Sequence, residues 1–229
     1  MAYLISALLL SPLLVWQGLQ TRRNTPHLPE PEGSRTRVVA NARRQLLIIG
    51  DSSAAGVGVL HQDDALLGQL AQQLDNHVEI TLLAQRGAKS DAGIAWLKKH
   101  NASKYDWVII VFGVNDVTGM HSTQRWLRDQ TTLRDIIAKR FDNPRIIHCG
   151  LPPMGRFPAL AQPLRWHLGQ RAQAFDQALR QLHKQHANSV YLPLNFDLNP
   201  KAMASDGFHP GRPVYREWAK QLANIVKCG

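Results

Sequence analysis

Three short polar clusters in the sequence contain the residue types that nucleophilic catalysis needs. Gly50-Asp51-Ser52 supplies a hydroxyl, Gly113-Val114-Asn115-Asp116 supplies a side-chain amide, and Asp206-Gly207-Phe208-His209-Pro210 supplies a carboxylate and an imidazole. A serine hydroxyl is a weak nucleophile, so it needs a base, a group that orients the base, and donors for the developing oxyanion. Each cluster alone has a common turn composition. Together they contain a candidate for every part.

The last cluster suits a base and its orienting group. We expect His209 to take the proton of Ser52 on attack and to return it to the leaving group. Asp206, three residues before His209 in one tight loop, then accepts a hydrogen bond from the other ring nitrogen. We expect Asp51 and Asp116 to brace the site through hydrogen bonds and not to act on the substrate.

The first two clusters follow segments with strand character. Residues 46–49 form an apolar, partly β-branched run, as expected of a strand covered on both faces, and residues 107–112 form the strongest strand pattern. Further strands are predicted at 77–83, 145–149 and 190–192, and helices at 65–74, 91–100 with Ser90 as its N-cap, 126–141, 165–185 and 213–227. This alternation predicts a parallel sheet covered on both sides, with ligands at the carboxyl ends of its strands.

The ordered clusters resemble the sequence blocks of the SGNH hydrolases, also called the GDSL esterase and lipase superfamily. The resemblance covers residues 45–210. It implies a flavodoxin-like three-layer α/β/α sandwich with a mostly parallel five-stranded sheet. It also implies a serine hydrolase that cleaves carboxylic esters through an acyl-enzyme without a cofactor.

The resemblance assigns roles residue by residue. It implies the catalytic residues Ser52, Asp206 and His209, and an oxyanion hole formed by the backbone N–H groups of Ser52 and Gly87 and the side-chain amide of Asn115. Two departures occur: Ser53 stands where the motif's name has leucine, and Gln85-Arg86 precede Gly87 where the family often has asparagine. The α/β-hydrolase pattern Gly-x-Ser-x-Gly is not met, because Ala54 stands at its second glycine.

The apolar, proline-rich segment 151–160 follows a predicted strand end on the edge where the site is expected. It either lines a substrate pocket or packs on its own side chains. In the first case we expect Met154 and Phe157 to set the acyl-chain preference. The histidines and cysteines show no metal-ligand spacing, so no metal site is expected.

Composition narrows the function classes. The formal net charge of +10 favours anionic surfaces such as phospholipid headgroups. The basic residues are scattered, and no zinc-finger or aromatic RNA-binding pattern accompanies them, which argues against specific nucleic-acid binding. Two cysteines are too few for a disulfide scaffold, and we expect Cys149 to be a buried free thiol.

The N-terminal residues are the least globular part of the sequence. Residues 1–20 are predicted to be a signal or anchor segment, 21–36 a linker and 37–229 the hydrolase domain. The uncharged apolar stretch 3–19 predicts a membrane-associated or exported protein. If the stretch stays uncleaved, the arginines after it favour a cytoplasmic domain. The alternative is an amphipathic or buried N-terminal helix.

Two other functions use the same residues differently. One is a carbohydrate O-deacetylase with the same catalytic set on a more open, polar cleft. The other is a non-catalytic, membrane-tethered binding protein, which has no need of a base and its orienting group. The expected partner is a small-molecule or lipid ester. Acyl-chain length, a preference for esters over thioesters, and the oligomeric state do not follow from the sequence.

Overall fold

The computed structural model describes residues 9–229 except 41, 76, 102–103, 185 and 197. Its sheet has the strand order β1-β3-β2-β4-β5-β6, in which only β1 runs antiparallel to its neighbour. The strands are β1 (Thr36–Arg37), β2 (Arg44–Gly50), β3 (Val78–Ala84), β4 (Trp107–Val111), β5 (Arg145–Cys149) and β6 (Ser189–Leu192). The five parallel strands are those predicted. The edge strand β1 was not, because two residues carry no alternation pattern.

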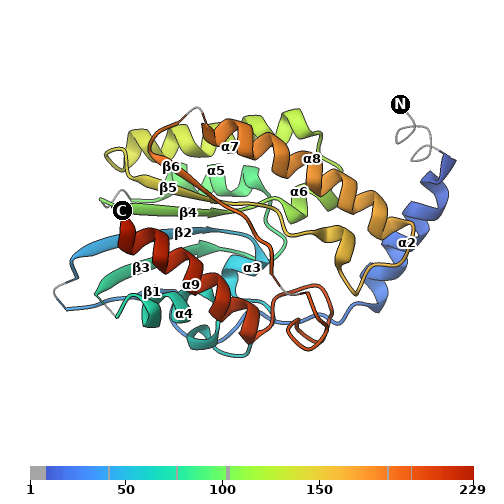
Figure 1. Ribbon diagram of the computed structural model, residues 1–229, viewed down its shortest axis with the longest axis horizontal. Coiled ribbons are helices and arrows are strands. Elements are labelled where there is room, and N and C mark those ends of the chain that lie inside the picture. The colour runs from blue at the N-terminus through green and yellow to red at the C-terminus, as the bar shows by residue number, and fades with distance from the viewer. Residues whose placement is uncertain (1–8, 41, 76, 102–103, 185, 197) are drawn as a thin grey trace.

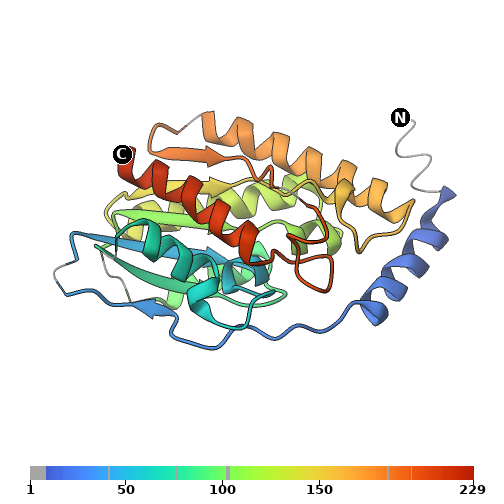
Figure 2. The same ribbon diagram turned by 60° about the horizontal axis from the view of Figure 1, so that its bottom comes forward.

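Helices cover both faces of the sheet and complete three layers (Figures 1 and 2). On one face α4 (Leu66–Gln73) packs against α9 (Arg212–Cys228). On the other, α5 (Ser90–Lys99) packs against α7 (Thr123–Arg140), and α8 (Leu164–Lys184) lies beside α7. The shorter elements are α2 (Ser11–Asn24), α3 (Ser52–Ala55), α6 (Val114–Thr118), η1 (Gln62–Asp64) and η2 (Met154–Arg156).

Strand β2 is the centre of the fold. Its side chains alternate between two apolar clusters, with Leu46 and Ile48 in one and Leu47 and Ile49 in the other, and all four are fully buried. Burial on both faces explains why this run shows no polar alternation. Its last residue, Gly50, is level with the last residues of β3 and β4. The loops after these strands therefore meet at one edge of the sheet.

The N-terminal segment contacts the domain more closely than a linker is expected to. Helix α2 crosses the boundary expected near residue 20, and the side chain of its buried Gln17 donates to the Gln162 carbonyl at 2.7 Å and accepts from the Leu164 N–H at 3.0 Å. Further on, Glu32 pairs with His61 in an isolated bridge. In the part of the chain that the structure describes, no helix has the length and apolar character needed to span a membrane.

Candidate active site

Ser52 is the first residue of α3, at the point where the chain leaves β2. Asp51 caps this helix, because its Oδ1 accepts the Ser53 N–H at 3.0 Å. Asp51 is almost fully buried, and its burial raises the pKa of this carboxyl to about 7, although the Ser53 N–H acts in the opposite direction. The expectation that Asp51 braces the turn agrees with this position.

The C-terminal loop brings the imidazole and the second carboxylate to Ser52. His209 Nε2 lies 2.9 Å from Ser52 Oγ, and His209 Nδ1 lies 2.5 Å from Asp206 Oδ2. An ionised carboxylate only accepts, so Nδ1 carries the proton and Nε2 accepts from the serine hydroxyl. Burial acts to raise the pKa of Asp206, but hydrogen bonds from the His209 ring and from the N–H groups of His209 and Phe208 outweigh it and hold that pKa below its ordinary value.

The three groups expected to form the oxyanion hole each keep a hydrogen that no described residue accepts. Within the described residues, the backbone N–H groups of Ser52 and Gly87 have no hydrogen-bond partner, and that of Ser52 is the first in its helix. Gly87 has φ +75°, and no protein atom lies within 4 Å of where a Cβ would be, so its backbone conformation selects glycine. Asn115 Nδ2 donates one hydrogen to the Ala88 carbonyl at 3.0 Å and keeps the other available.

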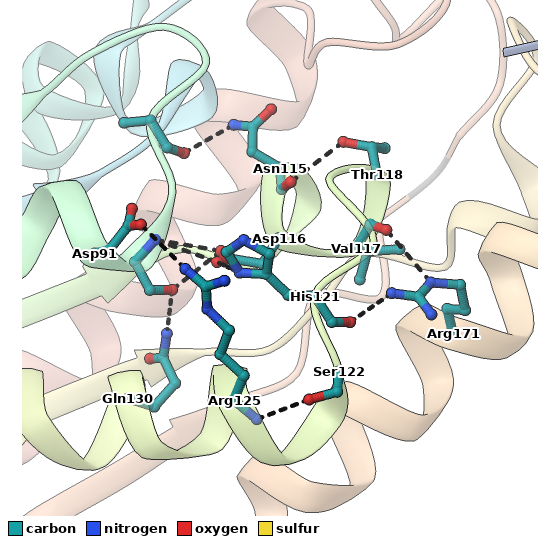
Figure 3. Close-up of polar contacts among 12 residues, drawn as sticks. Asp91, Asn115, Asp116, Val117, Thr118, His121, Ser122, Arg125, Gln130 and Arg171 are labelled. Carbon is teal, nitrogen blue, oxygen red and sulfur yellow. Dashed lines mark hydrogen bonds and ion pairs between the residues drawn. The ribbon is translucent and has the colours of Figure 1, made fainter.

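A buried polar network that includes Asp116 and Gln130 (Figure 3) holds Ser90, three residues after Gly87. Asp116 is fully buried and accepts the Ser90 hydroxyl at 3.0 Å, and Gln130 Nε2 donates to the same hydroxyl at 2.9 Å. Burial raises the pKa of Asp116, while the Ser90 donors lower it. The prediction that Ser90 is an N-cap was wrong: Ser90 is the first residue of α5, and its hydroxyl binds Asp116.

The segment expected to be a linker holds Arg86, the residue before Gly87. Glu30 Oε1 accepts the Arg86 N–H at 2.6 Å, and the other carboxylate oxygen of Glu30 pairs with Arg35. The Arg86 guanidinium donates to the Leu28 carbonyl at 2.6 Å. Sequence reasoning missed Glu30, because a proline-rich stretch carries no pattern that points to a partner 56 residues away.

Gln130 was also missed, although the sequence contains a signal for it. It lies on α7 four residues after Trp126 and three before Leu133, and all three side chains are buried. A glutamine within an apolar helical stripe needs a buried hydrogen-bond partner. A search for buried partners of such a glutamine among the polar residues of the predicted site could have found Gln130.

A small apolar pocket of about 40 Å³ opens beside Ser52. Phe157 lines it, as expected of a residue that sets acyl preference, but Met154 does not line it and is fully buried in the core, where η2 turns it. Gly113, at φ +148°, lies against Leu151 of the wall. A Cβ on residue 113 would lie 3.0 Å from the Leu151 side chain. The other wall residues include Val111, Phe112, Val114, Phe196, Phe208 and Trp218.

The fold brings together three side chains of types that can bind metals, a grouping that the spacing in the sequence did not indicate. Asp116, His121 and Asp129 each bring one ligand-type atom within 4.8 Å of the others. His121 Nδ1 lies 3.1 Å from Asp116 Oδ1, which is an ion-pair distance. Asp129 Oδ2, the third member, is buried and has no hydrogen-bond partner among the described residues.

Comparison with solved structures shows the same fold. A lipolytic protein of the G-D-S-L family from Veillonella parvula matches with a TM-score of 0.66 at 12% identity, over 80% of this chain and 98% of that one. Est24, a carbohydrate acetylesterase from Sinorhizobium meliloti, matches with a TM-score of 0.63 at 16% identity, over 81% and 99%. The esterase EstA from Pseudoalteromonas sp. matches with a TM-score of 0.61 at 18% identity, over 81% and 97%.

Sequence comparison identifies the family. Among curated proteins, no sequence matches the chain significantly. The model of the GDSL-like Lipase/Acylhydrolase family, however, matches residues 48–217, a range that begins in β2 and ends in α9. The chain therefore belongs to the GDSL-like lipases and acylhydrolases of the SGNH superfamily, and it is a carboxylic ester hydrolase.

Proposed function

We propose that the enzyme cleaves its ester through an acyl-enzyme on Ser52. The observation that carries this proposal is the continuous hydrogen-bonded series from Ser52 Oγ through the His209 ring to Asp206, with steps of 2.9 and 2.5 Å. His209 removes the hydroxyl proton as Oγ bonds to the ester carbonyl carbon, and Asp206 stabilises the imidazolium that forms. His209 then gives the proton to the departing alcohol oxygen.

The negative charge on the former carbonyl oxygen is stabilised by three donors. These are the N–H groups of Ser52 and Gly87 and the second Nδ2 hydrogen of Asn115, none of which is occupied by a described acceptor. In the second half of the reaction, water gives a proton to His209 and attacks the acyl carbon. Collapse of this intermediate releases the acid and returns the proton to Ser52.

We further propose that the enzyme prefers short acyl groups. The pocket beside Ser52 has a volume of about 40 Å³ and a mostly apolar wall, which suits a group of few atoms. Phe157 closes part of this wall and contacts the ring of Phe208, the neighbour of His209, with 5.1 Å between ring centroids. The match to a named carbohydrate acetylesterase supports a short-acyl activity, because acetyl is the shortest ordinary acyl group.

The test is hydrolysis of p-nitrophenyl esters from acetate to long acyl chains by the full chain and by Ser52→Ala. We expect fastest turnover on the shortest esters, no turnover by Ser52→Ala, and a mass adduct on Ser52 after treatment with an activated phosphonate ester. Phe157→Ala is expected to shift the preference toward longer chains. Turnover that survives Ser52→Ala would disprove the acyl-enzyme, and a long-chain optimum in the parent would disprove the short-acyl preference.

We also propose that residues 3–19 associate with a membrane; residues 3–8 of this stretch lie outside the described part. In support, five of the nine exposed large apolar side chains that the structure describes fall in this stretch: Leu9, Leu13, Val15, Trp16 and Leu19. Arg22 and Arg23 follow, at the end of α2, and suit anionic headgroups. The same arginines favour a cytoplasmic position for the domain if the stretch is retained.

Co-sedimentation of the full chain with vesicles of phosphatidylcholine and phosphatidylglycerol tests this association. We expect Trp16→Ser to weaken vesicle binding. The matched control is Met120→Ser, because Met120 is an equally exposed apolar side chain outside the stretch. Equal binding by the two variants would contradict the proposal.

A further inference from the structure

The connection between α6 and α7 brings three side chains of metal-binding types together, directly after the proposed oxyanion donor Asn115. Asp116 lies in α6, His121 in the loop and Asp129 in α7, and Figure 3 shows the His121 ring next to the Asp116 carboxylate. Each of the three residues offers one ligand-type atom, and these atoms all lie within 4.8 Å of one another. A single connection between two helices therefore sets the spacing of the whole group.

Two of these side chains carry atoms that the protein leaves without a partner. Among the described residues, His121 Nδ1 and Asp129 Oδ2 are shielded from solvent and make no hydrogen bond. The His121 residue is only 8% exposed. Its Nδ1 lies 3.1 Å from Asp116 Oδ1, but the two atoms are not aligned as a hydrogen bond requires. Buried polar atoms without partners are rare in folded proteins, and a bound ion is one of the few causes that account for them.

The two oxygens of Asp116 have different surroundings. Oδ2 accepts the Ser90 hydroxyl at 3.0 Å, whereas Oδ1 has only a long contact of 3.4 Å with the Ser90 N–H and faces His121. The Ser90 hydroxyl, which is itself held by Gln130, orients Asp116 as an outer partner orients a metal-bound carboxylate. The 3.1 Å separation of Oδ1 and Nδ1 also fits, because neighbouring ligands at about 2.1 Å from zinc lie roughly 3.0–3.4 Å apart.

The electrostatics of the group favour a cation. Burial raises the pKa of both Asp116 and Asp129, and it outweighs the positive groups near them. One of these groups, the Arg125 guanidinium, is half exposed and lies 3.6 Å from another carboxylate, that of Asp91. A divalent ion between the carboxylates would supply the positive charge that keeps buried carboxylates ionised.

We propose that Asp116, His121 and Asp129 bind one divalent ion of the zinc type. Two carboxylates and one imidazole suit Zn²⁺ better than Mg²⁺ or Ca²⁺, which take oxygen ligands. With three protein ligands, the fourth tetrahedral position is left for water. The ion would join α6, which carries Asn115, to α7. We therefore assign it a structural role beside the oxyanion hole and no part in the proton transfers at the nucleophile.

Calorimetric titration of Zn²⁺ into the metal-free full chain tests the site. We expect one tight site per chain, and a fall in affinity of about 100-fold or more in His121→Gln and in Asp129→Ala. The matched controls are His77→Gln and Asp135→Ala, which remove an exposed histidine and an exposed aspartate of α7 outside the group. Both controls are expected to bind Zn²⁺ as the parent does. Mg²⁺ and Ca²⁺ are expected to bind the parent more weakly.

Thermal unfolding gives a second measurement that does not depend on ester hydrolysis. At a Zn²⁺ concentration of 100 times Kd, the Tm of the parent should rise by about 5–10 °C, and that of Asp129→Ala should change little. Asp129 is partly exposed on a helix and alanine favours helices, so this variant is expected to fold. A parent that binds no Zn²⁺, or equal affinities in the parent and both ligand variants, would overturn the site. Tighter binding of Mg²⁺ or Ca²⁺ than of Zn²⁺ would overturn the assignment of a zinc-type ion.

Discussion

The two sides of the active site are built in different ways. On the nucleophile side, Ser52 and Asp206 each contact the ring of His209 directly, and Asp206 and His209 belong to one loop of four residues. On the proposed oxyanion side, Gly87 lies in the loop before α5 and Asn115 in α6, and neither donates to the other. Their geometry comes from residues further from the reaction.

This difference has a physical reason. A proton moves between Ser52 and His209, so these groups must be within hydrogen-bond distance of each other. Oxyanion donors must instead leave their hydrogens open to the substrate, so other contacts have to hold them. The Gly87 loop is held by Glu30 at Arg86 and by Asp116 at Ser90. Substitutions on the nucleophile side should therefore abolish most of the activity. Substitutions on the oxyanion side should lower kcat by smaller steps, which decrease with distance from the substrate.

The largest effect is expected on the nucleophile side. His209→Ala removes the base, and Asp206→Asn replaces the carboxylate with an amide whose NH₂ group can donate to Nδ1, so the His209 proton is no longer held on Nδ1. Each is expected to lower kcat for p-nitrophenyl acetate by about 10⁴-fold. Combining the two should cost little more than either alone, because they act as a unit. If the losses in kcat of the two single variants multiplied in the double variant, His209 and Asp206 would not act as a unit.

A smaller loss is expected for an oxyanion donor. Asn115→Ala removes one of three donors and should lower kcat about 100-fold to 1,000-fold while the site retains the other two. Steady-state kinetics on p-nitrophenyl acetate measures this, with Asn24→Ala at the exposed end of α2 as the control. A loss as large as that of His209→Ala would remove the distinction between the two sides.

A graded loss is expected one step further from the substrate. Ser90→Ala breaks the contacts of Ser90 Oγ with Asp116 and Gln130, which loosens the Gly87 loop. We expect kcat to fall about tenfold with KM unchanged, because a small misplacement affects donors that act in the transition state. Ser122→Ala is the matched control: Ser122 caps α7, so its loss should cost about 1 kcal/mol of stability without changing kcat. Equal kcat values for the two variants would assign Ser90 a purely structural role.

The sequence predicted the nucleophile side of the site better than the contacts that hold the oxyanion side. Ser52, Asp206 and His209 lie in short clusters whose composition and spacing follow from the chemistry, and the structure brings their side chains together. The five parallel strands were predicted equally well, because burial on both faces leaves an unbroken apolar run such as residues 46–49.

The oxyanion side depends on contacts between residues far apart in the chain, and no local sequence pattern indicates such contacts. Glu30 contacts Arg86 across 56 residues, and Gln130 contacts Ser90 across 40. Neither pairing follows from a periodicity. Met154 shows the same limit within one loop. For the segment 151–160 the sequence left open a pocket wall or a loop packed on itself, and the turn of η2 places Phe157 at the pocket and Met154 in the core. The direction of a side chain in a loop depends on tertiary contacts, and the pattern of apolar residues in the sequence does not reveal these contacts.

The smallest expected effect concerns the carboxylate that braces the nucleophile side. Burial raises the pKa of Asp51 to about 7, so between roughly pH 4 and pH 7 the folded protein holds a proton that the unfolded chain releases. The stability contributed by protonated Asp51 is therefore lost as pH rises through this window. Asp51→Asn keeps an oxygen for the Ser53 N–H but cannot ionise, so its Tm relative to the parent should rise by a few °C from pH 5 to pH 8. Thermal unfolding at both pH values measures the difference. A constant difference would mean that Asp51 stays in one ionisation state across the range, and the brace would then be equally strong at every pH at which the enzyme is assayed.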